Sequence, residues 1–377
     1  MIRYPGRNSN SAPSHHLSCY RLATLLTTSL ATCLVLFLLA TRGNAQAVLD
    51  WEIIPNFYLF IIAISFFLPF TWISGSGRWR FLTTLRRVSV GGLAQTQDGK
   101  FGDILMADAL TSYAKPLGDL FVALCMFFSH GKSSTGKPDR NCGGTFMVPV
   151  ILAIPSLIRL RQCIIEYLRV QRANAGSGPK LSSGWGGQHL ANALKYATAF
   201  PVIILSAMQR NYQPGKYNLS ETGLYRLWLL FLLLNSVYSF YWDVAKDWDL
   251  SLFSSKAERN NPDHPWGLRS NRYFHSNNMY YTAIGIDFVL RFTWSIKLSP
   301  HLDHLNEIEG GIFFLEILEV FRRWMWIFFR VETEWGRCHS LLFYIIRLIR
   351  LAVRNNRGPA PDDILLGDYN ADKYGED

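Results

Sequence analysis

One segment, residues 311–332, constrains the fold more than any other. It reads GIFFLEILEVFRRWMWIFFRVE, long enough to cross a bilayer as a helix, yet near its middle it carries Glu316, Glu319, Arg322 and Arg323. A charged side chain at bilayer depth costs about 2.5–3.5 kcal/mol on insertion scales, so such residues normally face a protein interior or a wet cavity. The spacing of Glu319, Arg322 and Arg323 places them on one helix face. We therefore expect this helix to bury charge inside a membrane protein.

The composition agrees with a membrane location. Of the 377 residues, 49% are hydrophobic and 14% aromatic, and long uncharged runs recur along the chain, which is typical of a polytopic membrane protein. A formal net charge of +10 would favour nucleic-acid binding in a soluble protein. Here Lys and Arg gather in alternate loops, which is the pattern of membrane topology. We therefore exclude nucleic acid as a partner and expect a lipid bilayer around the chain.

Apolar runs predict an all-α bundle of about eight transmembrane helices. They cover residues 22–40, 51–73, 103–128, 145–160, 190–208, 224–243, 279–298 and 311–332. Pro149 and Pro155 are expected to kink the fourth helix. The basic segment RWRFLTTLRRV, within residues 75–102, has the spacing of an interfacial amphipathic helix. Residues 341–353 predict a further amphipathic helix on the cytosolic face.

The first apolar run has a second interpretation, a cleaved secretory signal. Arg3, Arg7 and Arg21 would form its basic region, and Ala45 and Ala47 form an A-x-A cleavage pattern after the apolar core. We prefer an uncleaved helix, because the run is longer than most signal sequences and further spans follow it.

The loop charges predict which side each loop faces. Lys plus Arg number three before the first span and five in each of the loops 75–103, 159–189 and 243–278, whereas the opposite loops hold one, three, two and none. The basic loops and both termini should therefore lie in the cytosol. Asn218 opens an N-x-S sequon in a loop on the opposite, luminal side, where a glycan could be attached.

Ionisable residues recur inside the expected spans and form the candidate site. Besides the four in residues 311–332, they are Asp108, Lys115, Asp119, Lys195, Asp243, Asp247, Asp287 and Arg291. They could simply form interhelical ion pairs, but because several helices contribute we favour a transport path. Adjacent guanidinium groups suit a tetrahedral oxyanion such as phosphate. Carboxylates nearby could accept the hydroxyl proton of hydrogen phosphate and keep the bases from trapping the anion.

Other chemistries find little support in the sequence. The six cysteines show no CxxC pair and no regular spacing, so we expect free thiols, with neither a zinc site nor a disulfide framework. The sequence Asp247-Trp248-Asp249 fits the D-x-D pattern of glycosyltransferases but lacks a nucleotide-binding context. No nucleophile elbow, P-loop or dinucleotide fingerprint appears. We expect no enzyme activity, no cofactor and no bound metal.

Three stretches resemble the signature segments of the EXS domain family. They are residues 235–250 (NSVYSFYWDVAKDWDL), 287–296 (DFVLRFTWSI) and 318–332 (LEVFRRWMWIFFRVE), with weaker matches at Asp108, at residues 155–162 (PSLIRLRQ) and at residues 192–198 (NALKYAT). This family includes phosphate exporters of the retrovirus-receptor type. The resemblance implies a transport domain over residues 75–338. It would follow a disordered cytosolic segment (1–20) and two accessory helices (21–74), and precede a cytosolic amphipathic segment with an acidic tail (339–377).

The resemblance also implies roles for particular residues. Phosphate would contact Asp108, Lys195, Tyr196, Asp243, Asp247, Arg291, Arg322 and Arg323, and Trp294 with Glu319 would belong to a gate. Only about twenty residues precede the first span, so the sensor domain of the plasma-membrane exporters, named SPX, is not expected. The short form resembles the fungal ER-retention-defective branch.

That branch implies a function in the Golgi membrane. The protein would move phosphate released by glycosylation from the lumen to the cytosol and so support the retention of glycosyltransferases and ER proteins. The alternative is a sorting adaptor that retains glycosyltransferases without transport. Glycosyltransferases, coat machinery and a second copy of the chain are candidate partners.

Overall fold

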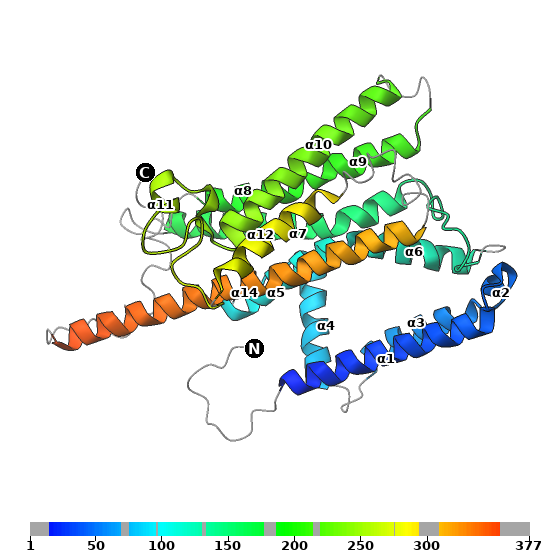
Figure 1. The fold of residues 1–377 in the computed structure, drawn as a ribbon, viewed down its shortest axis with the longest axis horizontal. Coiled ribbons are helices and arrows are strands. Elements are labelled where there is room, and N and C mark those ends of the chain that lie inside the picture. Colours follow the sequence, from blue (N-terminus) through cyan, green and yellow to red (C-terminus); the bar gives the residue numbers. More distant parts are fainter. Residues whose placement is uncertain are drawn as a thin grey trace. The chain divides into compact units, whose positions relative to one another are not determined.

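The computed structural model describes residues 15–68, 75–95, 97–129, 133–176, 186–213, 219–274, 276–293 and 309–354. Within these ranges every regular element is a helix and no strand occurs (Figure 1), which confirms the all-α prediction. The longer helices are α1 (His15–Thr41), α3 (Ile53–Phe67), α4 (Gly75–Ser89), α5 (Gln97–Ser112), α6 (Ala114–Phe128), α7 (Met147–Gly176), α8 (Gly187–Ala197), α9 (Ala199–Arg210), α10 (Glu221–Trp242), α12 (Asn277–Arg291) and α14 (Glu309–Arg354). Shorter ones are α2 (Ala45–Asp50), α11 (Lys256–Arg259), the π-helix η1 (Asp243–Asp247) and the 3-10 helix η2 (Ser251–Phe253).

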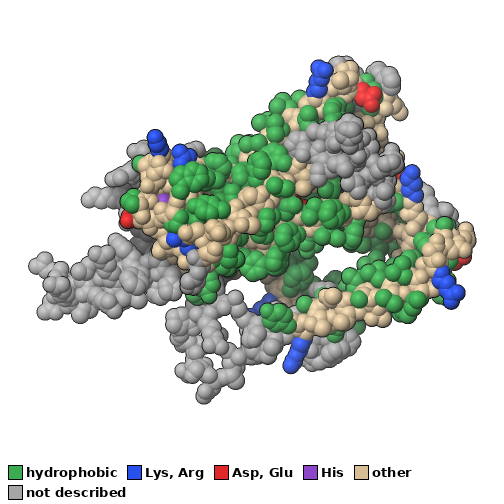
Figure 2. All heavy atoms as spheres, viewed as in Figure 1, with side chains coloured by type: hydrophobic (Ala, Val, Ile, Leu, Met, Phe, Trp, Pro, Cys, Tyr) green, Lys and Arg blue, Asp and Glu red, His purple; other side chains and the backbone are tan. Residues whose placement is uncertain are grey.

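Five helical segments of the described chain are long and apolar enough to cross a membrane. They are Tyr20–Thr41, Ala45–Ser65, Met147–Ala175, Gly187–Arg210 and Glu221–Asp247. Large hydrophobic side chains remain exposed along them; Leu38 of α1 and Leu230 of α10, for example, are 65% and 51% exposed. Figure 2 shows hydrophobic side chains on the visible faces of these helices. Such faces require lipid. The chain is therefore a polytopic membrane protein, while the number eight stays a prediction.

Helix α14 shows why length and hydropathy alone do not count every span. It is 46 residues long, about 69 Å at 1.5 Å per residue and well beyond the thickness of a bilayer. Its apolar part contains the four charged residues of the segment 311–332. It also runs without a break through residues 341–353, so the expected amphipathic helix is a continuation of α14.

The chain divides into two compact units, the first comprising residues 1–90 and 117–148. In it α1 and α3 run side by side, joined through α2 (Figure 1). The α6–α7 connection is tied to the start of α3: Glu52 accepts hydrogen bonds from Ser133 Oγ (2.5 Å) and Ser134 N (3.0 Å), and Asn56 Nδ2 donates to Ser134 Oγ (2.8 Å). These contacts fix the start of α3.

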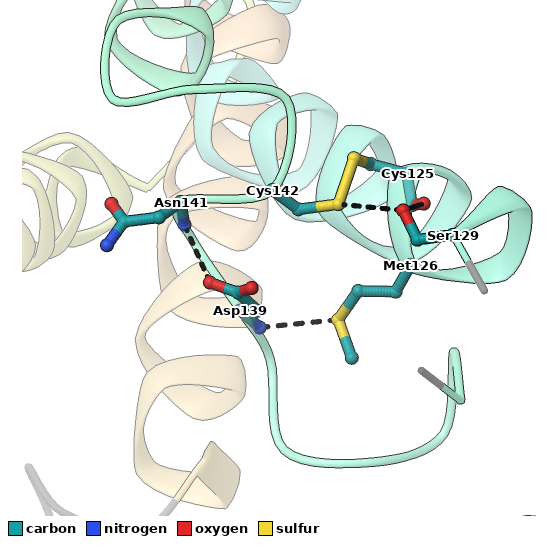
Figure 3. The surroundings of a disulfide bond; sticks show 6 residues. All are labelled: Cys125, Met126, Ser129, Asp139, Asn141 and Cys142. Atoms are coloured by element: carbon teal, nitrogen blue, oxygen red, sulfur yellow. Dashed lines mark hydrogen bonds between the residues drawn. A yellow bond between two sulfur atoms is a disulfide. The ribbon is translucent and has the colours of Figure 1, made fainter. Parts of the chain in front are cut away.

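A disulfide joins Cys125 at the end of α6 to Cys142 in the α6–α7 connection (Figure 3). The expectation that all cysteines are free thiols was wrong for this pair, because the chain turns back after α6 and brings together two residues that their spacing of 17 does not mark as partners. Cys33 and Cys163 are free and buried. Around the bridge, Asp139 N donates to Met126 Sδ (3.2 Å) and Asn141 N to the Asp139 carboxylate (3.0 Å). These hydrogen bonds hold residues 139–141 close to the bridge.

The second unit, residues 91–116 and 149–377, contains the remaining helices. Helix α10 lies against α9, and α12 against α14. An apolar core forms where η1, α12 and α14 meet. Its buried members are Val244, Trp248, Leu250, Leu268, Tyr280, Ala283, Met325, Trp326 and Phe329. This core fixes the π-helix, which carries two of the predicted site residues, against α14.

Prolines account for two helix breaks that the predicted spans do not contain. The expected third span divides into α5 and α6 at Tyr113, because Pro116 has no N–H to donate to the carbonyl of Ser112. The expected fifth span likewise changes from α8 to α9 at Thr198, three residues before Pro201. Each break lies within one turn of candidate site residues.

The fourth helix ends later than expected. The prediction stopped it at residue 160, where basic residues begin, but α7 continues to Gly176 through Pro155. Arg159, the first basic residue of this stretch, lies within the helix and is buried.

Candidate functional site: a buried charge network

Asp243 lies at the centre of a charge network inside the second unit and is 0% exposed. Its carboxylate accepts a hydrogen bond from Lys195 Nζ on α8 (2.8 Å), contacts Arg322 Nη1 on α14 (3.4 Å) and forms a close ion pair with Arg291 Nη2 on α12. Three cations from three helices therefore share one carboxylate. Removing water from so many charges is costly unless they neutralise each other.

A second acid, Asp247, joins this centre from the π-helix that follows α10. Helix α10 ends at Trp242, and the chain continues as η1 with a wider turn. Lys195 Nζ lies 3.2 Å from Asp247 Oδ2 as well as 2.8 Å from Asp243. Single π-turns within helices are frequent at functional sites. Both carboxylates of this turn contact the same lysine.

Arg322 connects the centre to the charged middle of α14. It is 1% exposed and donates to both oxygens of Glu319 (2.6 and 2.9 Å) and to Asp287 Oδ1 (3.2 Å). Such fork-shaped pairing is the strong form of the arginine–carboxylate contact. The Glu319 side chain is itself 38% exposed, so it lies at the open edge of the network.

Arg323 differs from the other bases. It is 6% exposed, and it donates to Ser112 Oγ (2.9 Å) and Thr111 Oγ1 (3.0 Å) at the end of α5, while its guanidinium lies 4.6 Å from the ring centre of Trp326. Within the described part of the chain, no carboxylate lies within the 4.0 Å ion-pair distance of this guanidinium. Ser112 in turn donates to Glu319 (2.7 Å). Arg323 is thus a buried cation with neutral partners.

A second part of the network surrounds Asp108 on α5. Its Oδ1 accepts from Arg159 Nε on α7 (2.6 Å) and from the Tyr196 hydroxyl on α8 (2.5 Å), and Arg159 also donates to Gln162 (2.6 Å). Sequence reasoning missed Arg159 because it followed an apolar run and was assigned to a cytosolic loop. Its place in the PSLIRLRQ stretch was the available signal.

The structure brings together all eight residues predicted to contact phosphate, together with the gate candidate Glu319. Trp294 and the sequon residue Asn218 lie outside the described residues. Lys115 pairs with Glu316 (3.2 Å). Ten groups form the inner part of the network, with five bases (Arg159, Lys195, Arg291, Arg322, Arg323) and five acids (Asp108, Asp243, Asp247, Asp287, Glu319). Arg330 approaches Asp247 from outside this group, at 4.0 Å. With every member ionised, the charges of these ten groups balance.

A separate clasp holds the chain that follows η1. Arg269 donates to the carbonyl of Trp248 (2.7 Å) and to Thr333 (2.5 Å), and it forms an ion pair with Glu332 (2.7 Å). Glu332 also accepts from the Tyr280 hydroxyl. The clasp fastens the end of the π-helix to α14 and so positions the two η1 carboxylates.

No group of three or more potential metal ligands occurs among the described residues. The pairing within the network instead uses the side chains that recognise an oxyanion, namely arginine, lysine and hydroxyl groups.

Comparison with known proteins places the chain in a family. The EXS family model matches residues 3–336. Protein ERD1 homolog 2 of Schizosaccharomyces pombe is 34% identical over 317 residues, which cover 83% of this chain and 75% of that protein. Protein ERD1 of Saccharomyces cerevisiae is 31% identical over 62% of this chain and 55% of its own length. Solute carrier family 53 member 1 of Cricetulus griseus is 31% identical over 62% of this chain but only 32% of its own length. The chain therefore belongs to the EXS family.

Proposed function

We propose that this protein moves inorganic phosphate across the membrane through the charge network. The observation that carries the proposal is Arg323, a buried guanidinium without a carboxylate partner among the described residues, set in a network that is otherwise paired. A buried cation of this kind is a binding site for an anion. The name of the relative called a solute carrier agrees with transport.

The base–carboxylate pairs of the network allow the anion to bind and to leave again. Each remaining base already has a carboxylate, so an entering phosphate competes with that carboxylate for the base. Binding is then strong enough for entry and weak enough for release, as conduction requires. Glu319 is the most exposed acid of the network and holds Arg322, which supports a role at the gate.

We place this activity in the Golgi membrane, with phosphate moving from the lumen to the cytosol. The similarity to ERD1 proteins and the resemblance to the ER-retention-defective branch support this location. Removal of phosphate left by glycosylation would in turn support retention of glycosyltransferases and ER proteins.

The disulfide supports one orientation of the chain. Disulfides form in oxidising compartments such as the secretory lumen, so the Cys125–Cys142 bridge favours a luminal α6–α7 connection. The loop charges independently favour the same side for it, with both termini in the cytosol.

Reconstituted protein tests the proposal. Radiolabelled phosphate uptake into liposomes is measured beside sulfate, with both signs of gradient and potential, for the wild type and for Arg322→Ala combined with Arg323→Ala. Arg226→Ala, which removes an exposed arginine of α10, is the matched control. Phosphate uptake by the wild type and the control, lost in the double variant, supports the proposal. No uptake by a folded wild type refutes it.

The second candidate is a sorting adaptor, in which the buried charges have only a structural role. An adaptor depends on its cytosolic surface rather than on the network. Normal glycosyltransferase retention by a folded but transport-dead variant would favour it.

A further inference from the structure

Two buried polar atoms of α12 lack hydrogen-bond partners among the described residues. One is Asp287 Oδ2, an acceptor, and the other is Arg291 Nε, a donor. They belong to residues one helical turn apart, and Asp287 is 0% exposed. A buried polar atom without a partner is costly, so such atoms call for an explanation. Two of opposite type on adjacent turns indicate a ligand that can both donate and accept.

A second atom of each side chain is engaged. Asp287 Oδ1 accepts from Arg322 Nη1 (3.2 Å), and Arg291 Nη2 pairs with Asp243. The two residues do not satisfy each other, since Arg291 Nε lies 4.0 Å from Asp287 Oδ1, which is too far for a hydrogen bond. Both residues are therefore held in place by the network while one atom of each remains available.

The chemistry of the available atoms defines the ligand. An ionised carboxylate only accepts hydrogen bonds, so the ligand atom that faces Asp287 Oδ2 must carry a hydrogen. The atom that faces Arg291 Nε must be an acceptor and is favoured by negative charge. A protonated tetrahedral oxyanion has both kinds of atom on one centre. Fully ionised sulfate has only acceptors and would bring an oxygen anion against the carboxylate.

We propose that Asp287 is the specificity-determining residue of the transport site, accepting the hydroxyl of hydrogen phosphate or arsenate and rejecting sulfate. This inference rests on the proposed phosphate transport and adds to it a basis for choosing phosphate over sulfate. Sites that hydrogen-bond a substrate hydroxyl reject analogues without it by large factors, because the buried group is then left unpaired. The proton stays on the ligand throughout, so no covalent bond forms or breaks.

The substitution Asp287→Asn tests the assignment. An amide keeps the shape and leaves an oxygen to accept from Arg322, while its N–H can donate to an unprotonated oxyanion. The matched control is Asp263→Asn, which removes a carboxylate from an exposed loop position. Initial uptake rates of labelled phosphate and labelled sulfate are measured in liposomes for the three proteins.

We expect the wild type and Asp263→Asn to prefer phosphate over sulfate by about 100-fold or more, and Asp287→Asn to lower this ratio by at least about tenfold. An unchanged ratio in a variant that still takes up phosphate would overturn the role of Asp287 while leaving phosphate transport intact. Absence of phosphate uptake by the wild type would overturn both.

A competition experiment on the wild type keeps the inference testable if Asp287→Asn does not fold. Unlabelled arsenate, which carries a hydroxyl, should compete with labelled phosphate, whereas sulfate at the same concentration should not. Equal competition by both anions would contradict selection through a hydroxyl.

Discussion

Asp243 offers the sharpest test of the network, because three cations share its charge. At an effective dielectric constant of about 20, two unit charges 4 Å apart interact by about 4 kcal/mol, and the contacts of Asp243 with Lys195 and Arg322 are shorter, at 2.8 and 3.4 Å. Asp243→Asn keeps the shape and removes the charge. Removing one partner of a buried pair costs about 3–5 kcal/mol. We therefore expect the free energy of unfolding to fall by about 5 kcal/mol and the melting temperature by about 10 °C or more.

The double variant with Lys195→Met separates charge balance from packing. It removes one cation together with the carboxylate, so its loss of stability should be smaller than the sum of the two single losses by about 1–3 kcal/mol. Recovery of stability should be incomplete, because Arg330, at 4.0 Å, is then the one basic partner of Asp247 among the described residues. Unfolding in detergent, followed by circular dichroism, measures all four corners of the cycle, with Asp263→Asn as a surface control. If the loss of stability in the double variant equals the sum of the two single losses to within about 0.5 kcal/mol, the account of a shared charge is refuted.

Three further predictions follow from contacts outside this centre. Replacing both Cys125 and Cys142 by Ala removes the bridge, whose cysteines are 17 residues apart, and should lower the free energy of unfolding by about 3 kcal/mol. If the denatured wild type has the same number of free thiols before and after reduction, the bridge is disproved. Arg269→Ala removes the clasp on the end of η1, so trypsin should cleave the loop 249–276 faster than in Arg269→Lys, and equal rates would contradict that role. Tyr196→Phe removes a hydrogen bond to a buried carboxylate and should cost about 1.5–3 kcal/mol in the same unfolding assay; no loss would show that this contact contributes nothing.

Much of the architecture was predictable because buried charges in a membrane protein appear in the sequence as charged residues within apolar runs. Glu319, Arg322 and Arg323 within an apolar run predicted a polar interior, and the structure indeed places them against α5 and α12. The residues carried over from the family resemblance converge on the same network.

The missed features share a physical reason, namely that hydropathy does not record tertiary contacts. Arg159 reads as the start of a basic loop, and only the approach of Asp108 from α5 makes its burial favourable. The breaks at Tyr113 and Thr198 depend on single prolines within otherwise apolar stretches. The disulfide depends on the path of the chain after α6, which spacing alone does not give.

Phosphate flux through an Arg323→Gln variant tests the central claim most directly. Glutamine can still donate a hydrogen bond to the hydroxyl groups of α5, so the helix contacts are largely kept while the cation without a carboxylate partner is lost. Initial uptake of labelled phosphate into liposomes should fall at least about tenfold, since a hydrogen bond to a charged group contributes about 1.5–3 kcal/mol, while Arg226→Gln should match the wild type. Wild-type uptake by a folded Arg323→Gln protein would contradict an anion path through this network.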